Sequence, residues 1–298
     1  MTDISAIAYV LGEEDLSYED IPNWEQSAQL HNMAPLPELW GWGRLRRTNR
    51  DIADLAVQTG EQSLKEAGIE AADIDSLYLC CTAFPSSLAQ QRDLIDSIQS
   101  RLGLDHADVT GVTLGRCTNA LVALRAATAA VAAGMSRTAL VITADRITNE
   151  TERFVNFAIF SDGAASCVVT EAPVAAGYTV VAAAASHDST GDDHISAQLA
   201  IDVNDTIYRA SGIDTSAIAG LSHNNIYAPI VALKERQAGF TEDQLYTDNI
   251  TRIGHCFAAD PLINLADRER NAAIESDGHY LLAASVPGSR VAILTRRR

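Results

Sequence analysis

The strongest candidate for covalent chemistry is Cys117, which lies where a predicted strand passes into a predicted helix. A short β-branched run breaks at Gly115, and a long Ala- and Leu-rich helical pattern begins just after the cysteine. Unpaired backbone N–H groups and the positive end of the helix dipole at such a junction favour a thiolate, and the charge of Arg116 acts in the same direction. The sequence therefore predicts a nucleophilic thiol, with a small buried structural cysteine as the alternative.

Two histidines are the candidate bases for this thiol. His223 follows a predicted strand, at a position where an earlier copy of the same pattern has Leu79. His255 lies in GHCFAA at 254–259, which is similar to GRCTNA at 115–120. If the similar segments are copies of one unit packed about a pseudo-twofold axis, their junctions approach each other. A cysteine and histidines that converge in this way form a nucleophile with candidate bases, whereas a lone histidine is more often structural.

An internal repeat supports that arrangement. KEAGIEAADIDSLYL from Lys65 and RASGIDTSAIAGLSH from Arg209 place Gly-Ile, the next Ile and the following Leu at identical offsets. Helical patterns alternate with continuous apolar strands such as TALVITAD at 138–145, which is typical of a mainly parallel sheet covered on both faces. We therefore predict an α/β fold of two duplicated halves, residues 1–172 with the nucleophile and residues 173–298 with the histidines.

The composition argues against several classes of protein. With 298 residues, 47% of them hydrophobic and 20% charged, the chain is long enough for a large core. A net charge of −17 argues against general nucleic-acid binding, and the lack of an apolar run of about 18 residues argues against a membrane span. The acidic start MTDISAIAYVLGEEDLS is unlike a signal peptide, so we expect a cytoplasmic protein. The five cysteines are odd in number and lack C-x-x-C spacing, which predicts neither a disulfide framework nor a zinc site.

Two charged segments have weaker interpretations. The basic island of Arg44, Arg46 and Arg47 suits a phosphate or an acidic carrier protein, with solvated surface charge as the alternative. The basic tail at 296–298 is best explained as surface charge.

A polar loop, HDSTGDDH, contains candidate metal ligands. They are His187, Asp188, Asp192, Asp193 and His194. The loop lacks the regular oxygen spacing of a calcium loop, so we predict no metal site. The chain also contains no G-x-G-x-x-G or G-x-x-x-x-G-K motif, which argues against a dinucleotide or nucleoside-triphosphate cofactor.

The sequence resembles the thiolase superfamily over nearly its whole length, and within it the β-ketoacyl-acyl-carrier-protein synthase III branch. Five short motifs in the family's order carry the resemblance. They are RCTN at 116–119, FSDGA at 160–164, HNNI at 223–226, GHCFAA at 254–259 and VPGS at 286–289. The resemblance implies a thiolase-like fold with α-β-α-β-α layers. It also implies a homodimer whose sheets pair edge to edge, with the apolar strand at 140–144 near the interface.

The resemblance further implies a reaction and the residues that perform it. Cys117 takes an acyl group from a coenzyme A or acyl-carrier-protein thioester, and His223 and His255 transfer protons and donate hydrogen bonds. The backbone N–H groups of Cys117 and Gly288 hold the oxyanion, and no tightly bound cofactor is needed. The residues expected to bind substrate are Arg44, Arg47 and Asn225.

Two departures from the family pattern affect the expected reaction. His255 stands where the family has asparagine, and Ile226 replaces the asparagine that closes the histidine motif. Both changes alter the hydrogen bonds that stabilise a malonyl-derived enolate. We therefore predict an acyltransferase that passes its acyl group to a small-molecule acceptor in specialised-metabolite or polyketide biosynthesis. A decarboxylative condensing enzyme and a non-catalytic partner subunit are the alternatives.

His223 and His255 are expected to divide the work: one keeps Cys117 as a thiolate and the other accepts the proton of the acceptor, and the sequence leaves open which does which. An imidazole can accept the proton of a hydroxyl or amine acceptor, which an asparagine cannot. We expect His255→Asn to leave acylation of Cys117 largely intact and to slow transfer by roughly 10²- to 10⁴-fold. The stretch between Asp162 and His223 is shorter than in typical family members, which predicts a more open acyl pocket.

Overall fold

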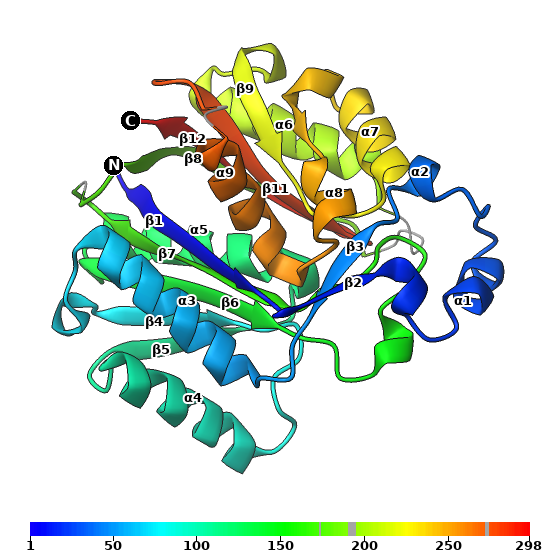
Figure 1. Cartoon of the computed structure of the whole chain (residues 1–298). Coiled ribbons are helices and arrows are strands. Elements are labelled where there is room, and N and C mark those ends of the chain that lie inside the picture. Colours follow the sequence, from blue (N-terminus) through cyan, green and yellow to red (C-terminus); the bar gives the residue numbers. More distant parts are fainter. Residues whose placement is uncertain (173, 190–194, 272–273) are drawn as a thin grey trace.

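Ten strands form one sheet that contains the same five-strand order twice (Figure 1). The structure is a computed structural model and describes residues 1–172, 174–189, 195–271 and 274–298. The strands of the first copy are β1 (Asp3–Leu11), β4 (Ser76–Cys80), β5 (Asp108–Val112), β6 (Thr138–Asp145) and β7 (Gly163–Thr170). Those of the second copy are β8 (Gly177–His187), β9 (Ile218–Ser222), β10 (Leu245–Tyr246), β11 (His279–Val286) and β12 (Ser289–Arg297). The spatial order is β1-β7-β6-β4-β5 in the first copy and β8-β12-β11-β9-β10 in the second.

The two copies meet at their first strands. β1 pairs antiparallel with β8 from Asp3↔Thr179 to Ser5↔Gly177. In each copy four strands run in one direction, and the fifth, β7 or β12, runs against both of its neighbours. The duplicated α/β fold expected from the sequence is therefore confirmed, with one antiparallel strand in each copy.

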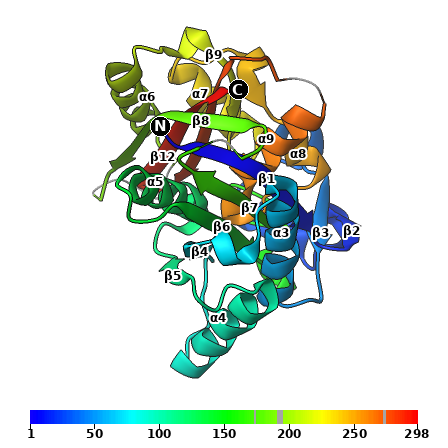
Figure 2. The same cartoon turned by 90° about the vertical axis from the view of Figure 1, so that its left-hand side faces the viewer.

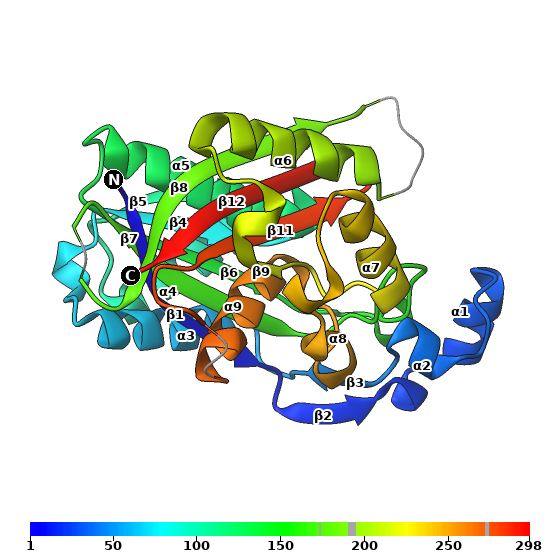
Figure 3. The ribbon, with the colours of Figure 1, turned by 90° about the horizontal axis from the view of Figure 1, so that it is seen from above.

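Helices cover the outer faces of the two copies and fill the space between them (Figures 2 and 3). The helices of these layers are α3 (Ile52–Ala67), α4 (Leu88–Leu102), α5 (Asn119–Ala132), α6 (Ala197–Ser211), α7 (Ala228–Gln237) and α9 (Asp260–Arg270). α5 and α9 each contact strands of both copies, so they form the central layer. α3 packs on strands of the first copy and α6 on strands of the second, which gives the α-β-α-β-α order of a thiolase-like fold.

The repeat that begins at Lys65 and Arg209 has a structural basis. α3 ends at Gly68 and α6 ends at Gly212, and both glycines take a left-handed backbone with φ of 63° and 74°. Glycine adopts this conformation at little cost, which explains why both copies have Gly-Ile where the helix stops.

The match of GRCTNA at 115–120 with GHCFAA at 254–259 differs by two positions from the structural equivalence of the two segments. Arg116 and Phe257 both have a left-handed φ of 53°, and each opens a 3₁₀ turn that leads into α5 or α9. The two turns are η3 (Arg116–Thr118) and η7 (Phe257–Ala259). Phe257 is therefore the counterpart of Arg116, whereas the similarity of the letters pairs Arg116 with His255. Ala258, rather than Cys256, is the counterpart of Cys117.

The sheet edges bear on the expected dimer, which stays a prediction. β6 pairs with both β4 and β7, so the strand at 140–144 is interior and cannot form an edge-to-edge contact. Among the described strands, β5 and β10 lie at the two edges.

The remaining elements lie beside one end of the large sheet (Figure 1). They are β2 (Glu14–Ser17), β3 (Arg44–Arg47), α1 (Trp24–Leu30), α2 (Pro37–Trp40) and α8 (Asp248–Arg252). β2 and β3 form a separate two-stranded sheet. Trp42 packs beside them against Phe154, with 4.9 Å between ring centroids. No helix in the described part of the chain is both long and apolar enough to cross a membrane.

Candidate active site

Cys117 lies in a cavity of about 280 Å³ that is lined by residues of both copies. The lining residues are Thr82, Arg116, Cys117, Phe157, Phe160, Ile195, His255, Phe257, Ser285, Val286 and Pro287. Aromatic and aliphatic side chains form more than half of this wall. A cavity of this kind, with a few convergent polar groups, suits an acyl chain attached to a reactive carbonyl group.

The turn before α5 positions the thiol. Arg116 has a φ of 53°, which a residue with a side chain adopts only with strain, and such strain is concentrated at functional sites. Its Nη2 donates to the Pro287 carbonyl oxygen at 2.6 Å, so the guanidinium ties this turn to the hairpin between β11 and β12. Cys117 follows directly, in the 3₁₀ turn that leads into α5 and close to the positive end of the helix dipole.

His255 contacts the thiol. Its Nε2 lies 3.2 Å from Cys117 Sγ. The backbone of His255 donates to the Ile159 carbonyl oxygen at 2.8 Å and accepts from the Ser161 N–H at 2.9 Å. Since these partners belong to the first copy, the histidine of the second copy is fixed directly beside the nucleophile of the first.

Asp260 completes the site and was not expected from the sequence. Its Oδ2 is hydrogen-bonded to His255 Nδ1, and its Oδ1 accepts from the Cys256 N–H at 2.7 Å. Asn225 supports the same carboxylate, because its backbone N–H donates to Oδ2 at 2.6 Å and its Nδ2 to Oδ1 at 3.2 Å. Asp260 opens α9 and is followed by Pro261, a helix-start pattern that marks the aspartate as a residue at a junction.

The electrostatics of this set favour a charged imidazole. Burial alone would lower the pKa of His255, but the carboxylate of Asp260 and the sulfur of Cys117 raise it to about 10. At neutral pH the ring therefore carries a proton on each nitrogen and donates to both partners. Cys117 Sγ therefore faces a charged N–H donor at 3.2 Å.

We expect folding stability to depend on this charged histidine. The pKa of an unfolded histidine is near 6.5 and that of His255 is about 10. The stabilisation is therefore fully present below pH 6.5 and is lost as the pH rises through 10. Urea unfolding at pH 7 and pH 10.5 should show a loss of stability that is larger in the wild type than in His255→Gln by at least about 1 kcal/mol. Equal losses in the two proteins would contradict the charged state.

His223 has a different environment from the one expected. It is not among the residues that line the Cys117 cavity. Its Nδ1 donates to the Asn224 carbonyl oxygen at 3.1 Å, and its Nε2 accepts from Lys234 Nζ at 2.6 Å. Burial and the charge of Lys234 hold the pKa of His223 well below its usual range, so the ring is neutral. The structure thus brings only one of the two predicted histidines into contact with Cys117.

The two arginines expected to bind substrate have acidic partners on a neighbouring strand. Arg44 pairs with Asp15 at 2.8 Å, and Arg47 pairs with Glu14, both across β2 and β3. Neither arginine lines the Cys117 cavity. Asn225, the third residue of that group, is buried and holds Asp260 instead of lining the cavity.

Gly288 lies in the tight turn between β11 and β12. Val286 pairs with Ser289, so Pro287 and Gly288 are the central residues of the turn, and the glycine has a φ of 73°. Proline followed by a residue with positive φ is the pattern of a type II turn. A Cβ at this position would lie 2.7 Å from the Asp188 carbonyl oxygen, so the close approach of the two backbones requires glycine.

Cys256, next to His255 in the chain, is a poor alternative nucleophile. It is fully buried and does not line the cavity. Burial and the nearby carboxylate of Asp260 raise the pKa of Cys256 well above its usual range, which keeps it a neutral thiol.

The polar loop at 187–194 is only partly described. Asp192, Asp193 and His194 lie outside the described residues. Among the residues that the structure does describe, no group of three or more His, Cys, Asp or Glu side chains is arranged to hold a metal ion. Ile195, directly after the loop, lines the Cys117 cavity.

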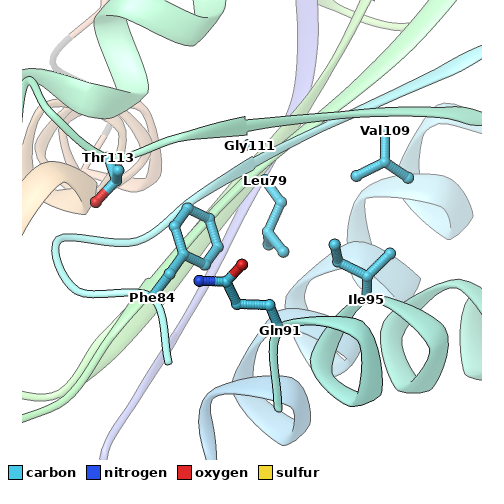
Figure 4. A pocket seen from close by; sticks show the side chains of 7 residues that line it. All are labelled: Leu79, Phe84, Gln91, Ile95, Val109, Gly111 and Thr113. Carbon is cyan, nitrogen blue, oxygen red and sulfur yellow. The ribbon is translucent and has the colours of Figure 1, made fainter. Parts of the chain in front are cut away.

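A second cavity lies beside the edge strand β5 and is lined by residues without titratable side chains (Figure 4). They are Leu79, Phe84, Gln91, Ile95, Val109, Gly111 and Thr113. Thr113 Oγ1 donates to the carbonyl oxygen of Thr82, a residue that lines the first cavity. Since only the first has a nucleophile and a base, it is the candidate active site.

Comparison of sequences gives partial matches to one family. A model of the family 3-oxoacyl-[acyl-carrier-protein (ACP)] synthase III matches residues 113–189. The β-ketoacyl-[acyl-carrier-protein] synthase III of Rhodospirillum rubrum is 34% identical over 126 residues, which cover 41% of this chain and 37% of that protein. The enzyme of the same name from Aliarcobacter butzleri is 28% identical over 130 residues, 43% of this chain and 38% of that protein. The sequence matches thus span little more than a third of these relatives.

Comparison of structures extends over the whole chain. The 3-oxoacyl-[acyl-carrier-protein] synthase III of Aquifex aeolicus VF5 superposes with a TM-score of 0.83 at 16% identity, covering 99% of this chain and 100% of that one. The acyltransferase ChlB3 gives 0.81 at 19% identity, covering 99% and 97%. OleA of Xanthomonas campestris, with bound lauric acid and lauroyl-CoA, gives 0.81 at 14% identity, covering 100% and 99%. The chain therefore has the thiolase-like fold. By sequence, part of the chain is similar to β-ketoacyl-[acyl-carrier-protein] synthase III.

Proposed function

We propose that the protein is an acyltransferase that loads an acyl group from a coenzyme A or acyl-carrier-protein thioester onto Cys117 and passes it to a small-molecule acceptor. The observation that carries this proposal is the set of contacts from Cys117 Sγ through His255 to the Asp260 carboxylate. A thiol, a base and a group that orients the base are the parts that acyl transfer requires. The shared fold of ChlB3 and of OleA with its bound lauroyl-CoA supports a thioester donor.

The first half-reaction forms the acyl-enzyme. The thiolate of Cys117 attacks the thioester carbonyl carbon, a new carbon–sulfur bond forms, and the carbonyl electron pair moves onto oxygen. When this intermediate collapses, the bond to the donor sulfur breaks, and that sulfur takes the proton from His255 Nε2. The backbone N–H groups of Cys117 and Gly288 are the proposed donors to the negatively charged oxygen.

The second half-reaction transfers the acyl group. His255 is now neutral, still oriented by Asp260, and accepts the proton of the acceptor as the acceptor attacks the acyl-enzyme. Collapse of the second intermediate releases the Cys117 thiolate beside the re-formed imidazolium. One histidine thus performs both proton transfers in this mechanism. The division of roles between His223 and His255 that we expected from the sequence is not part of the proposal.

Decarboxylative condensation is the second candidate, because the relatives matched by sequence are named β-ketoacyl-[acyl-carrier-protein] synthase III. That reaction needs hydrogen-bond donors to a malonyl-derived enolate. Here Ile226 is a buried apolar residue, and His223 Nε2 is occupied by Lys234. These two observations favour simple acyl transfer.

Intact-protein mass spectrometry after incubation with a panel of acyl thioesters tests the proposal. The panel includes acetyl, octanoyl, lauroyl and malonyl groups, each on coenzyme A and on an acyl carrier protein. We expect a single acyl adduct on Cys117 and no catalytic release of carbon dioxide from the malonyl thioesters. Catalytic carbon dioxide release would support the condensing enzyme, and the lack of an adduct from every donor would support a non-catalytic partner subunit.

We also propose that the protein forms a homodimer through the edge strand β5. Within β5, Asp108, Thr110 and Gly111 are exposed and Val109 and Val112 are partly buried, which fits a strand at a free edge of the sheet. Two large apolar side chains near this edge, Leu88 and Leu114, are 84% and 95% exposed. If a second copy paired its own β5 antiparallel to this one, the β5 edge of each protomer would be covered by the other.

Sedimentation at micromolar concentration should therefore give twice the chain mass of 31.9 kDa. Leu114→Glu should shift the protein towards monomer, because it places a charge in the proposed apolar contact. Met135→Glu is the matched control, since Met135 is 83% exposed and lies beyond the other end of α5. A wild-type protein that sediments only as monomer would overturn the proposal.

A further inference from the structure

A buried charge cluster lies directly behind one wall of the Cys117 cavity. It consists of His223, Lys234, Glu235, Ser285 and Arg290, from the end of β9 and from α7, β11 and β12. None of its charged side chains is more than 3% exposed. Within the cluster only Ser285 lines the Cys117 cavity. The steps of acyl transfer described above use none of these groups.

Ser285 receives hydrogen bonds from two cations. Its Oγ accepts from Lys234 Nζ at 2.9 Å and from Arg290 Nη1 at 3.2 Å. His223 Nε2 lies 3.2 Å from the same oxygen, but its lone pair already accepts from Lys234 at 2.6 Å. Protonated lysine and arginine are donors only. The hydroxyl hydrogen of Ser285 therefore has no acceptor among these neighbours, and the cavity that Ser285 lines is the direction left to it.

The cluster has an excess of positive charge. Glu235 is its one carboxylate, and it accepts from Arg290 at 2.6 and 3.0 Å and from Lys234 at 2.8 Å. Burial lowers the pKa of Lys234 to about 7 against the opposing effect of Glu235. A negatively charged oxygen hydrogen-bonded to Ser285 would balance the second cation and favour the protonated lysine.

Asn224 fixes Ser285 relative to the nucleophile. Its Oδ1 accepts from the Ser285 N–H at 2.8 Å, and its Nδ2 donates to the Cys117 carbonyl oxygen at 3.4 Å. Asn224 is 1% exposed, so these bonds are shielded from water. One side chain thus links the backbone of the nucleophile to the backbone of the hydroxyl donor, as a preorganised site requires.

We propose that the Ser285 hydroxyl donates a hydrogen bond to the substrate oxygen that becomes negatively charged when Cys117 attacks an acyl group, and that Lys234 and Arg290 polarise this hydroxyl. The proposal rests on acyl transfer as the function. It makes Ser285 a catalytic residue, because it touches the reacting oxygen. Lys234 and Arg290 are positioning and polarising residues, because they act through Ser285.

The test compares two reactions of Cys117 that differ in one respect. Acylation by 4-nitrophenyl butyrate, followed as a burst of nitrophenolate, places negative charge on a carbonyl oxygen. Alkylation by iodoacetamide uses the same thiolate and places no charge on such an oxygen. The activated ester reacts with the thiol whatever the natural donor is, so the result does not depend on finding that donor.

Ser285→Ala should slow the nitrophenolate burst by roughly 10²-fold, the usual effect of losing one oxyanion donor, and change alkylation by less than about threefold. Ser285→Thr, which keeps the hydroxyl, should stay within about tenfold of the wild type in the burst. Lys234→Met, which keeps Ser285 but removes one polarising donor, should slow the burst by about tenfold and leave alkylation unchanged.

Two outcomes would overturn the proposal. If Ser285→Ala leaves the burst rate unchanged, the hydroxyl does not stabilise the oxygen. If Ser285→Ala and Lys234→Met slow acylation and alkylation equally, the cluster acts only by holding the structure around Cys117. Failure of acyl transfer itself would be seen separately, as a wild-type protein that gives a burst with the ester but no adduct with any thioester.

Discussion

Cys117→Ala should acquire no acyl adduct from any thioester that loads the wild type, while its fold stays intact. The thiol is the one cysteine sulfur among the residues that line the cavity, and Cys256 is buried as a neutral thiol. Loss of one sulfur at a helix start should lower the free energy of unfolding by only about 1 to 3 kcal/mol. Intact-protein mass spectrometry and urea unfolding measure the two quantities separately.

Cys256→Ala is the matched control for this experiment. It removes a sulfur of the same kind from the adjacent junction, so its cost in stability should be similar and its acyl adduct should remain. A stoichiometric adduct on Cys117→Ala that disappears in the double variant would show that Cys256 is the nucleophile and that our assignment is wrong.

His255→Asn should slow both half-reactions by roughly 10²- to 10⁴-fold, the usual effect of losing a general acid–base group. From the sequence alone we expected acylation to survive this change. The structure alters the expectation, because His255 Nε2 lies 3.2 Å from Cys117 Sγ and is the proposed proton donor to the leaving thiol. Single-turnover acylation by an acyl thioester and subsequent transfer to an acceptor measure the two steps.

Asp260→Asn keeps the size of the side chain and removes its charge, so it separates orientation from charge. We expect Asp260→Asn to slow both acylation and transfer, as His255→Asn does, because an amide does not stabilise the imidazolium of His255. His223→Gln is the control for replacing a buried histidine that does not contact Cys117. It should retain acyl transfer far better than His255→Asn. If the His255→Asn protein is acylated and transfers its acyl group at the wild-type rate, then Cys117, His255 and Asp260 are not the catalytic set.

The sequence predicted those features of the fold that depend on local patterns. The Gly-Ile pair at the end of α3 and α6, the apolar strands and the junction at Cys117 are all set by residues close to one another in the chain. The strand order was not predicted, but each copy repeats it, as expected of a duplication. The match of GRCTNA with GHCFAA drew attention to His255, but it paired Arg116 with the wrong residue. The two segments share Gly and Cys, whereas the backbone conformation shows that Phe257 is the residue equivalent to Arg116.

The remaining features of the site depend on contacts between distant segments. Asp260 joins the site only because the turn before α9 points its carboxylate at His255 Nδ1, which no sequence motif records. His223 follows its predicted strand, but Lys234 on α7 occupies its Nε2. Arg44 and Arg47 find acidic partners through the pairing of β2 with β3, which the spacing of the arginines does not reveal.

The junctions at Arg116 and Phe257 have the same backbone conformation and no longer the same chemistry. At the first, the chain has Cys117; at the second, the equivalent residue is Ala258, and α9 begins with Asp260 where α5 begins with Asn119. The contacts from Cys117 through His255 to Asp260 therefore join one residue of the first half to two residues of the second. This set of contacts exists because the two halves pack together, and either half alone would lack part of it.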